Sequence, residues 1–394
     1  MNQSIATMPA VREIPFGAMG GVYEQDDVDA AMRVVQGAVG THGNLFPLPE
    51  EVQFQVALAR HEGCQKAVAV NSCGTALDLC MMALDIKPGD EVITTPLTFV
   101  CTATCAIARG AKVVFADIDP VTLCLDPNSV RERITDRTRA ILPVHFAGLA
   151  ADCDAFDAIA EETGIPVVYD AAHAVATKHS GQPIGGRGKA SCYSFQSNKN
   201  MTTLGEGGAV TTNDEEFAEQ IRQRKTFGFT YVPALRCTSV GFNYRMTKPQ
   251  YAVGITQLAK IDRVIARRLE ASQWMQQELS DIEELILPAG IDDGHACHLY
   301  VVRLDTGRVG FDRPTLLKHL KEKYRVSCGN HYPAVWSWEV LSSLGYSESS
   351  ASCPIAAKAC QQVFSLPVFP HTTSDDCQYI GWALKQSLSM ARST

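Results

Sequence analysis

The sequence lacks several features that would indicate specialised classes of protein. It contains no uninterrupted run of about 18 apolar residues, which argues against a membrane-spanning helix. Its 35 basic residues are outnumbered by 43 acidic residues, giving a net charge of −8. This charge offers no general attraction to nucleic acid or to an anionic membrane. We therefore expect neither as a partner, and an anionic substrate must be met by local basic groups.

The fourteen cysteines also lack the spacings that would give them a special role. There is no C-x-x-C pair and no spacing typical of a zinc site, so we expect no metal. Several cysteines, among them Cys80, Cys101 and Cys105, have apolar or small neighbours, as free thiols in a reducing compartment do. The N-terminal stretch MNQSIATMPAVREIPF has no basic-then-apolar signal organisation. We therefore expect a cytoplasmic protein.

What the sequence does contain is a long alternation of apolar runs and helical patterns between residues 66 and 212. This alternation is typical of an α/β domain with a largely parallel sheet. The predicted strands are Lys66–Asn71, Glu91–Thr95, Lys112–Asp117, Arg139–Val144, Pro166–Asp170, Ser191–Phe195 and Gly208–Thr212. The predicted helices are Thr75–Leu84, Thr102–Ala108, Pro127–Ile134, Asp154–Thr163 and Glu215–Phe227. Because the strands are nearly continuous in apolar residues, we expect both faces of the sheet to be buried.

The pattern changes after residue 227. A long helical stretch from Thr247 to Leu279 could lead out of the first domain, and a smaller α+β unit follows. That unit has a predicted strand at Leu299–Leu304, a helix at Arg313–Tyr324 and a last helix after Ser374. A chain of 394 residues is long enough for two domains. We predict an N-terminal arm (1–22), a large domain (23–265) and a small C-terminal domain (266–394).

Two charged residues at predicted strand ends are candidates for chemistry, because ligands collect at the carboxyl ends of strands in open α/β sheets. Asp170 ends a buried strand, where a carboxylate is costly without a partner. A protonated ring nitrogen would be such a partner, and a helix cap is the alternative. Lys199 follows another strand, and a partly desolvated lysine is a nucleophile. Lys178 and Lys189 are alternatives, both in turn-like sequence.

Two further strand ends carry groups that suit a phosphorylated aromatic cofactor. In NSCGTALDL, the N–H groups of Gly74 and Thr75 and the Thr75 hydroxyl would point at a phosphate, aided by the helix dipole. An ordinary helix cap is the alternative. Phe99, in TTPLTFV, could stack on an aromatic ring or belong to the core. The order of phosphate cradle, stacking ring, acid and lysine favours a cofactor site.

The motifs D-A-A-H at 170–173, S-F-Q-S-N-K-N at 194–200 and G-E-G-G at 205–208 resemble the DegT-type (DegT/DnrJ/StrS) family of sugar aminotransferases, from about residue 23 to 384. The resemblance implies the α/β fold of fold-type I enzymes: a mainly parallel seven-stranded sheet and a smaller α+β C-terminal domain. It also implies pyridoxal 5′-phosphate as the cofactor. We then expect Lys199 to hold it as a Schiff base and Asp170 to pair with the pyridinium nitrogen.

Other roles follow from the same resemblance. His173 would lie near the ring hydroxyl, Phe99 would stack on the ring, and the phosphate would be bound by Cys73, Gly74, Thr75 and Ser194. The segment SVGFNYRMT implies that Asn243 and Arg245 complete the site of a partner subunit, and hence a homodimer with shared active sites. The residues implied near the acceptor are His298, Tyr300, Asn330, His331 and Tyr332.

Three departures from the family pattern suggest a less familiar substrate. Cys73 stands where serine is usual, Gln196-Ser197-Asn198 replaces the commoner residues before the lysine, and Val175-Ala176 replaces a frequent His-Gly. One branch of the family has histidine at the lysine position and performs dehydration. Lys199 argues against that activity.

The function implied is transfer of an amino group from glutamate or glutamine to a keto sugar, nucleotide-linked, in amino-sugar, polysaccharide or natural-product biosynthesis. A keto-cyclitol or other small ketone is an alternative acceptor, and a lyase, desulfurase or aldolase on the same fold is an alternative reaction. A nicotinamide dehydrogenase is disfavoured because the glycine-rich segment at 17–21 is not G-x-G-x-x-G. A non-catalytic regulator is disfavoured because Asp170 and Lys199 are both present.

Overall fold

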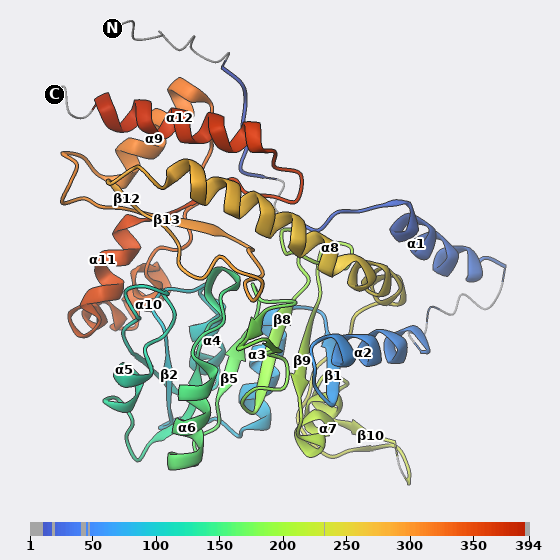
Figure 1. The fold of residues 1–394 in the computed structure, drawn as a ribbon. Helices are drawn as coiled ribbons and strands as arrows, with labels where there is room; N and C mark the ends of the chain where they lie inside the picture. The colour runs from blue at the N-terminus through green and yellow to red at the C-terminus, as the bar shows by residue number, and fades with distance from the viewer. Residues whose placement is uncertain (1–10, 18–19, 41–44, 46–47, 232, 391–394) are drawn as a thin grey trace, which may run out of the picture.

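The computed structural model describes residues 11–17, 20–40, 45, 48–231 and 233–390. Its centre is a seven-stranded sheet (Figure 1). The strands are β1 (Lys66–Val70), β2 (Glu91–Thr94), β3 (Lys112–Phe115), β4 (Thr138–Leu142), β5 (Val168–Asp170), β8 (Ala190–Ser194) and β9 (Gly208–Thr212). Two ladders, β1-β9-β8-β5 and β3-β2-β4, are joined by parallel bridges Ile141–Val167 and Val144–Asp170. Only β9 runs antiparallel to its neighbours, which confirms the predicted mainly parallel sheet.

The helices that connect or follow these strands pack against the sheet and form the first hydrophobic cluster with it (Figure 1). They are α3 (Cys73–Ala83), α4 (Cys101–Ile107), α5 (Pro127–Arg131), α6 (Cys153–Thr163) and α7 (Glu215–Arg224). Side-chain caps fix several of their first turns, as Ser72 does for α3 and Asp152 for α6. Gly164 ends α6 in the left-handed conformation, which glycine adopts at little cost.

Two N-terminal helices were not predicted from the sequence. They are α1 (Gln25–Gly37) and α2 (Glu50–His61). Helix α2 buries Phe54 and Leu58 in the first cluster, whereas α1 buries only Asp27 and Ala30. Helix α1 is therefore held mainly by polar contacts, while its apolar residues at helical spacing, Val28, Met32 and Val35, are exposed.

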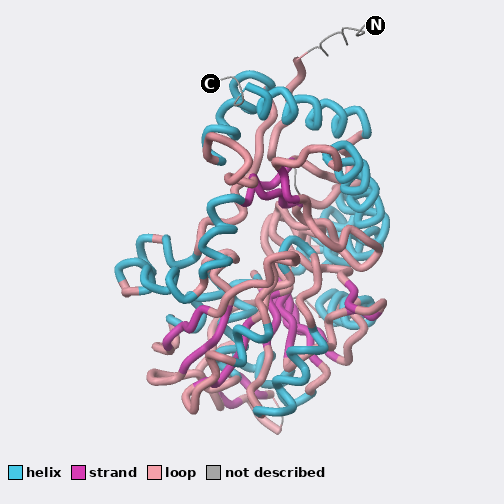
Figure 2. The backbone as a smooth tube through the Cα atoms, turned by 60° about the vertical axis from the view of Figure 1, so that its left-hand side comes forward, coloured by secondary structure: helices cyan, strands magenta, loops and turns pink. Residues whose placement is uncertain are grey.

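Helix α8 (Lys248–Leu279) connects the two parts of the molecule. Its first half packs in the first hydrophobic cluster, and its last turns pack in a second cluster. The second cluster lies around a small antiparallel sheet, β12 (Leu285–Ile286), β13 (Tyr300–Leu304) and β14 (Val363–Leu366), which Figure 2 shows apart from the larger sheet. Helices α9 (Arg313–Tyr324) and α12 (Ser374–Met390) cover it.

The chain after residue 266 also returns to the first cluster. Residues 334–336 and helix α11 (Pro354–Gln362) pack there. The domain boundaries at 22/23 and 265/266 stay predictions. The remaining regular elements are β6 (Lys178–His179), β7 (Gln182–Pro183), β10 (Phe229–Thr230), β11 (Arg236–Cys237) and α10 (Glu339–Ser343). Among the helices in the described ranges, none has the length and apolar character needed to cross a membrane.

Candidate active site

A cavity of about 540 Å³ opens where several strands of the large sheet end. Most of its wall comes from the turns after β1, β2, β5 and β8, and one part comes from the segment before residue 334. The lining residues include Ser72, Cys73, Gly74, Phe99, Asp170, His173, Ser194, Lys199, His331 and Tyr332. The structure thus brings together most of the residues that the sequence predicted for the site.

Asp170 is the last residue of β5 and is only 2% exposed. The Thr102 hydroxyl donates a hydrogen bond to Oδ2 at 2.7 Å, and the Ala172 N–H donates to Oδ1 at 3.0 Å. Burial raises the pKa of Asp170 in spite of these bonds, because desolvation disfavours the charged carboxylate. Within the described residues, no lysine, arginine or histidine forms an ion pair with it. The carboxylate therefore has room for a cationic partner.

Lys199 lies in the turn after β8 and lines the same cavity. Although the residue as a whole is only partly buried, burial of its ammonium group lowers the pKa of Lys199, while the charge of Asp170 opposes the shift. A lowered pKa makes more of the neutral, nucleophilic amine available. The rival lysines lie elsewhere: Lys189 pairs with Asp214 at 2.5 Å, and Lys178 is exposed in β6.

His173 is buried beside the cavity and is held by Tyr332. Its Nε2 atom lies 3.0 Å from the Tyr332 hydroxyl, and the two rings are nearly parallel. Burial, with the nearby charge of Lys199, lowers the pKa of His173, so the imidazole is neutral at neutral pH. Its Nδ1 atom is buried and has no hydrogen-bond partner among the described residues. A polar group of a ligand would satisfy it.

The turn from β1 into α3 forms one end of the cavity. Ser72, Cys73 and Gly74 line it at the helix N-terminus, where backbone N–H groups and the helix dipole favour an anion, and Ser194 lies on the same wall. Thr75 does not line the cavity. Its N–H donates to Ser72 Oγ at 3.1 Å, and its hydroxyl donates to Asn71 Oδ1 at 2.8 Å. Both groups thus cap the helix, which was the alternative interpretation.

Phe99 is unusually exposed for a large apolar residue, at 53% of its surface. Its ring lines the cavity and meets the Tyr332 ring edge-on at a centroid distance of 6.2 Å. An exposed aromatic face at this position is suited to stacking on a flat ring. Phe99 is therefore not a core residue, which was the alternative interpretation of the sequence.

The five residues implied near the acceptor separate into two groups. His331 and Tyr332 line the cavity. His298 lies behind His173, with ring centroids 4.5 Å apart, and bonds to Asn200. Asn330 accepts a hydrogen bond from Arg313 outside the cavity.

Tyr300 was misplaced by the sequence interpretation. Its hydroxyl donates to Gln276 Oε1 at 2.7 Å, and its ring is packed in the second hydrophobic cluster. Tyr300 begins β13, whose buried face holds the second cluster, so a position next to His298 in the sequence did not bring it to the cavity. We withdraw it as a substrate contact.

Asn243 and Arg245, implied as contacts to a partner subunit, lie outside this chain's cavity. The Arg245 Nε atom donates to Asn243 Oδ1 at 2.9 Å, and its guanidinium lies over the Phe227 ring. Their role across an interface stays a prediction.

The sequence interpretation missed several residues that line or support the site. Thr102 is the most informative, because it holds Asp170 from the first turn of α4. It stands at the start of the helix predicted at Thr102–Ala108, close behind the strand end at Phe99, and this position was a usable signal. The other missed residues are Cys101, Val144 and Glu206, all on the cavity wall. Their signal was weak, since Glu206 depends on the backbone of the G-E-G-G turn and not on a strand end.

The fold and the site together define a fold-type I aminotransferase that uses pyridoxal 5′-phosphate. The chain matches the model of the DegT/DnrJ/EryC1/StrS aminotransferase family over residues 24–385. It therefore belongs to this family, as the sequence motifs predicted.

Individual relatives agree with this assignment. The spore coat polysaccharide biosynthesis protein SpsC of Bacillus subtilis (strain 168) is 40% identical over 340 residues, covering 83% of this chain and 87% of SpsC. The structure of DesV from S. venezuelae has a TM-score of 0.84 at 31% identity, covering 92% of this chain and 94% of DesV. The aminotransferase from Psychrobacter cryohalolentis has a TM-score of 0.87 at 28% identity, covering 96% of this chain and 100% of that one.

The residues present fit this cofactor. The buried Asp170 without an ion-pair partner suits a protonated pyridine nitrogen, and the unpartnered Nδ1 atom of His173 suits the ring hydroxyl. The N-terminus of α3 and Ser194 suit the phosphate, and Phe99 offers a stacking face. Lys199 completes the set with an amine of lowered pKa.

Proposed function

We propose that this enzyme transfers an amino group from glutamate or glutamine to a nucleotide-linked keto sugar, in the biosynthesis of amino sugars, polysaccharides or natural products. The observation that carries the proposal is the pair formed by Asp170 and Lys199: a buried acid without an ion-pair partner and a lysine of lowered pKa on one cavity wall. The kinship with SpsC, a spore coat polysaccharide biosynthesis protein, supports a sugar as the acceptor class.

The bound cofactor supplies an electron sink for the carbon that loses its proton. Asp170 would accept the hydrogen bond of the ring N–H and favour the protonated form of that nitrogen, and Thr102 holds the carboxylate in place. The Lys199 amine would take the proton from the α-carbon of the amino donor and later give it up, acting first as a base and then as an acid. His173 binds the ring hydroxyl through Nδ1, and Tyr332 fixes the orientation of the imidazole.

The part of the cavity wall proposed to face the acceptor carries neutral polar groups. Burial lowers the pKa of His331 to about 4, so its imidazole is uncharged at neutral pH. Its Nδ1 atom lies 2.9 Å from Ser365 Oγ, which fixes the ring. Neutral donors and acceptors of this kind suit the hydroxyl groups of a sugar. A keto-cyclitol carries the same groups, and for that reason it stays the second candidate.

We further propose a cytoplasmic homodimer in which Asn243 and Arg245 reach the phosphate site of the partner subunit. Their position outside their own cavity supports this role. So do the exposed apolar side chains near them, of which Phe227 and Phe242 are each at least 40% exposed. All fourteen cysteines are free, as is typical of proteins in a reducing compartment.

Single-turnover half-reactions test the proposed substrates. Enzyme loaded with the cofactor is mixed with glutamate or glutamine, and the aminated enzyme is then mixed with nucleotide-linked keto sugars, free keto sugars or keto-cyclitols. Absorption spectra follow each half-reaction. We expect the aminated form with at least one of the two donors and the fastest return with a nucleotide-linked keto sugar. A faster return with a keto-cyclitol would make that class the acceptor, and a failure of both donors would contradict the proposed donor.

A further inference from the structure

The chain just before α1 lies against the loop that carries Lys199. A Cβ atom built on Gly20 would be 1.8 Å from the backbone oxygen of Ser197. One built on Gly21 would be 3.2 Å from the backbone oxygen of Asn200. Two residues later, the Tyr23 hydroxyl donates to Thr202 Oγ1 at 3.4 Å. Residues 20–23, called the N-terminal segment below, therefore run beside residues 197–202.

Space, and not backbone conformation, requires glycine at the first of these positions. Neither Gly20 nor Gly21 has a φ in the left-handed region that favours glycine. The contact of Gly20 is with backbone, which cannot rotate away as a side chain can. Alanine at Gly20 would thus displace either the N-terminal segment or the turn at Ser197. Which of the two moves depends on how firmly each is held.

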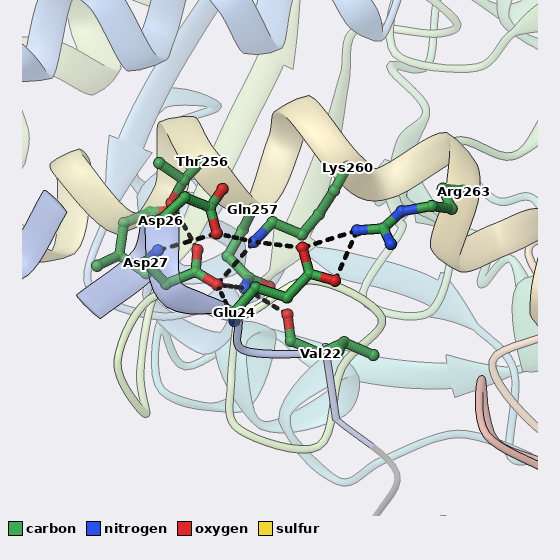
Figure 3. Close-up of polar contacts among 9 residues, drawn as sticks. Val22, Glu24, Asp26, Asp27, Thr256, Gln257, Lys260 and Arg263 are labelled. Atoms are coloured by element: carbon green, nitrogen blue, oxygen red, sulfur yellow. Dashed lines mark hydrogen bonds and ion pairs between the residues drawn. The ribbon is translucent and has the colours of Figure 1, made fainter. Parts of the chain in front are cut away.

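The N-terminal segment is held firmly by α8, as Figure 3 shows. The Gln257 side chain donates to the backbone oxygen of Val22 at 3.0 Å and to Asp27 Oδ2 at 2.9 Å. Lys260 donates to the same Asp27 oxygen at 2.7 Å, and the Glu24 N–H donates to it at 2.8 Å. Gln257 and Asp27 are each 2% exposed, so these bonds are shielded from water and are costly to break.

The loop is held less firmly on the side that faces solvent. Ser197 and Asn198 are exposed, and within the described chain their hydrogen bonds reach only Gln196 and Gly205 of the connection between β8 and β9. The buried end of the loop is anchored differently, because the Asn200 side chain donates to the backbone oxygen of Ala296 at 2.8 Å. The Ser197 N–H donates to the backbone oxygen of Gly205, and the Lys199 N–H donates to that of Gln196. The exposed Ser197–Asn198 turn is therefore the part of the loop that yields at the contact with Gly20, while the N-terminal segment stays in place.

We propose that Gly20 is a positioning residue for Lys199: its backbone, fixed through Gln257 to α8, limits how far the Ser197–Asn200 turn can move and so sets the place of the lysine amine in the cavity. This inference rests on the proposed role of Lys199 as the cofactor lysine. It goes further in assigning a function to a segment that precedes the family match, which begins at residue 24.

Gly20→Ala tests the proposal, with Gly17→Ala as the matched control. Gly17 lies in the same part of the chain, but a Cβ atom there meets nothing within 4 Å. The purified enzyme with its cofactor is assayed for kcat and for the KM of the amino donor, and its absorption band is titrated with pH. We expect kcat to fall roughly 10- to 100-fold in Gly20→Ala with little change in KM, because small displacements of a catalytic group have effects of this size.

The same variant should shift the pH midpoint of the absorption band, since the lysine nitrogen enters a different environment. A merely structural role of Gly20 would lower the yield or the melting temperature but leave the midpoint of the folded enzyme unchanged. Gly17→Ala should match the wild type in all three readouts. An unchanged kcat and an unchanged midpoint in folded Gly20→Ala would overturn the proposal.

Gln257→Leu provides a second test that adds no atoms near the loop. It releases the N-terminal segment by removing the bonds to Val22 and Asp27. Arg263→Ala is its control, because Arg263 pairs with Glu24 in the same cluster but does not contact Val22 or Asp27 (Figure 3). Hydrogen exchange of peptides spanning residues 196–202 is measured in the full chain, with and without cofactor. We expect faster exchange of this loop in Gln257→Leu only.

Unchanged exchange in Gln257→Leu would show that the segment does not hold the loop and would overturn the proposal. The exchange result does not depend on what Lys199 binds. The proposed function would fail on a different observation, a lysine-type absorption band that persists in Lys199→Ala. The two failures are therefore distinguishable.

Discussion

Two buried carboxylates, Glu62 and Asp170, have opposite surroundings. Glu62 is fully buried after α2, and its oxygens accept hydrogen bonds from the Tyr193 hydroxyl at 2.8 Å and the Ala176 N–H at 3.0 Å. The His61 ring completes the set at 3.0 Å. Asp170 is as deeply buried but accepts bonds only from neutral donors, and burial raises its pKa.

The difference separates a structural carboxylate from a functional one. Glu62 finds its cationic partner within the chain, so its charge is compensated when the protein folds. Asp170 has no such partner at ion-pairing distance among the described residues, so a bound cation would compensate its charge more fully than the nearby charge of Lys199 does. Depth of burial does not distinguish the two, whereas the identity of the partners does. The predictions below test this contrast, from the largest expected effect to the smallest.

Asp170→Asn should have the largest effect on activity. It removes the charge that pairs with the cofactor ring, and breaking a buried pair of this kind costs about 3–5 kcal/mol, or on the order of 10²–10⁴ in kcat/KM. The cofactor-free variant should nevertheless unfold at a higher temperature than the cofactor-free wild type at pH 7. Steady-state kinetics and calorimetry measure the two effects.

The sign of that stability change follows from the raised pKa of Asp170. An acid with a raised folded-state pKa contributes stability below its unfolded pKa of about 3.9, and this contribution is lost as pH rises through the folded value. Asparagine does not ionise, so the variant keeps this stabilising contribution at pH 7. A cofactor-free Asp170→Asn protein less stable than the wild type at pH 7 would show that Asp170 is compensated within the chain, as Glu62 is.

Glu62→Gln should instead lower the stability of the protein and leave its activity unchanged. It leaves His61 and Tyr193 with a neutral partner, and we expect the free energy of unfolding to fall by about 3 kcal/mol, the lower end for breaking a buried charge pair. The kcat of the folded enzyme should stay within experimental error. Glu216→Gln, at an exposed position on α7, is the control. A large loss of kcat in folded Glu62→Gln would give Glu62 a role in the chemistry.

Thr102→Val should lower kcat about tenfold, because it removes one hydrogen bond to a charged group, which is worth about 1.5–3 kcal/mol. Valine keeps the shape of threonine, so the change is mainly the loss of the donor. Thr98→Val is the comparison, since the Thr98 hydroxyl bonds to Thr102 but not to Asp170. Equal losses in the two variants would remove Thr102 from the role of holding the carboxylate.

The smallest expected effect is a dependence of the protein's stability on pH, caused by the ionisation of His61. Burial alone would lower its pKa, but the bonds to Glu62 and Asp262 raise the pKa of His61 to about 9. Its contribution is thus complete below about pH 6.5 and is lost as pH rises towards 9. After allowance for its partial exposure, we expect about 1 kcal/mol. The difference in unfolding free energy between wild type and His61→Gln should shrink over this window, and a constant difference would contradict the pairing.

The sequence predicted the sheet wall of the cavity well, and for a physical reason. Asp170 and Lys199 follow strands whose apolar runs mark their ends, so local pattern was enough to place them at one edge. Helix α8 was predicted to begin at Thr247, which the structure places as the cap residue just before it.

The other wall was not predictable in the same way. His331 and Tyr332 lie in a segment without a helix or strand, and long-range packing alone brings them to Asp170 and Lys199. The same limit explains Tyr300, whose sequence neighbourhood suggested the site while its strand directed it to the second cluster. Helix α1 is a different case, because Val28, Met32 and Val35 stand at a helical spacing that could have predicted it.

The most direct test of the central claim is the near-ultraviolet and visible absorption spectrum of the purified enzyme before and after glutamate is added. We expect a band from the lysine-bound cofactor that is replaced by that of the aminated cofactor. In Lys199→Ala the first band should be absent, even after incubation with pyridoxal 5′-phosphate. A lysine-type band that persists in Lys199→Ala would contradict the assignment of Lys199, and with it the account of Asp170 as the acid that pairs with the bound cofactor.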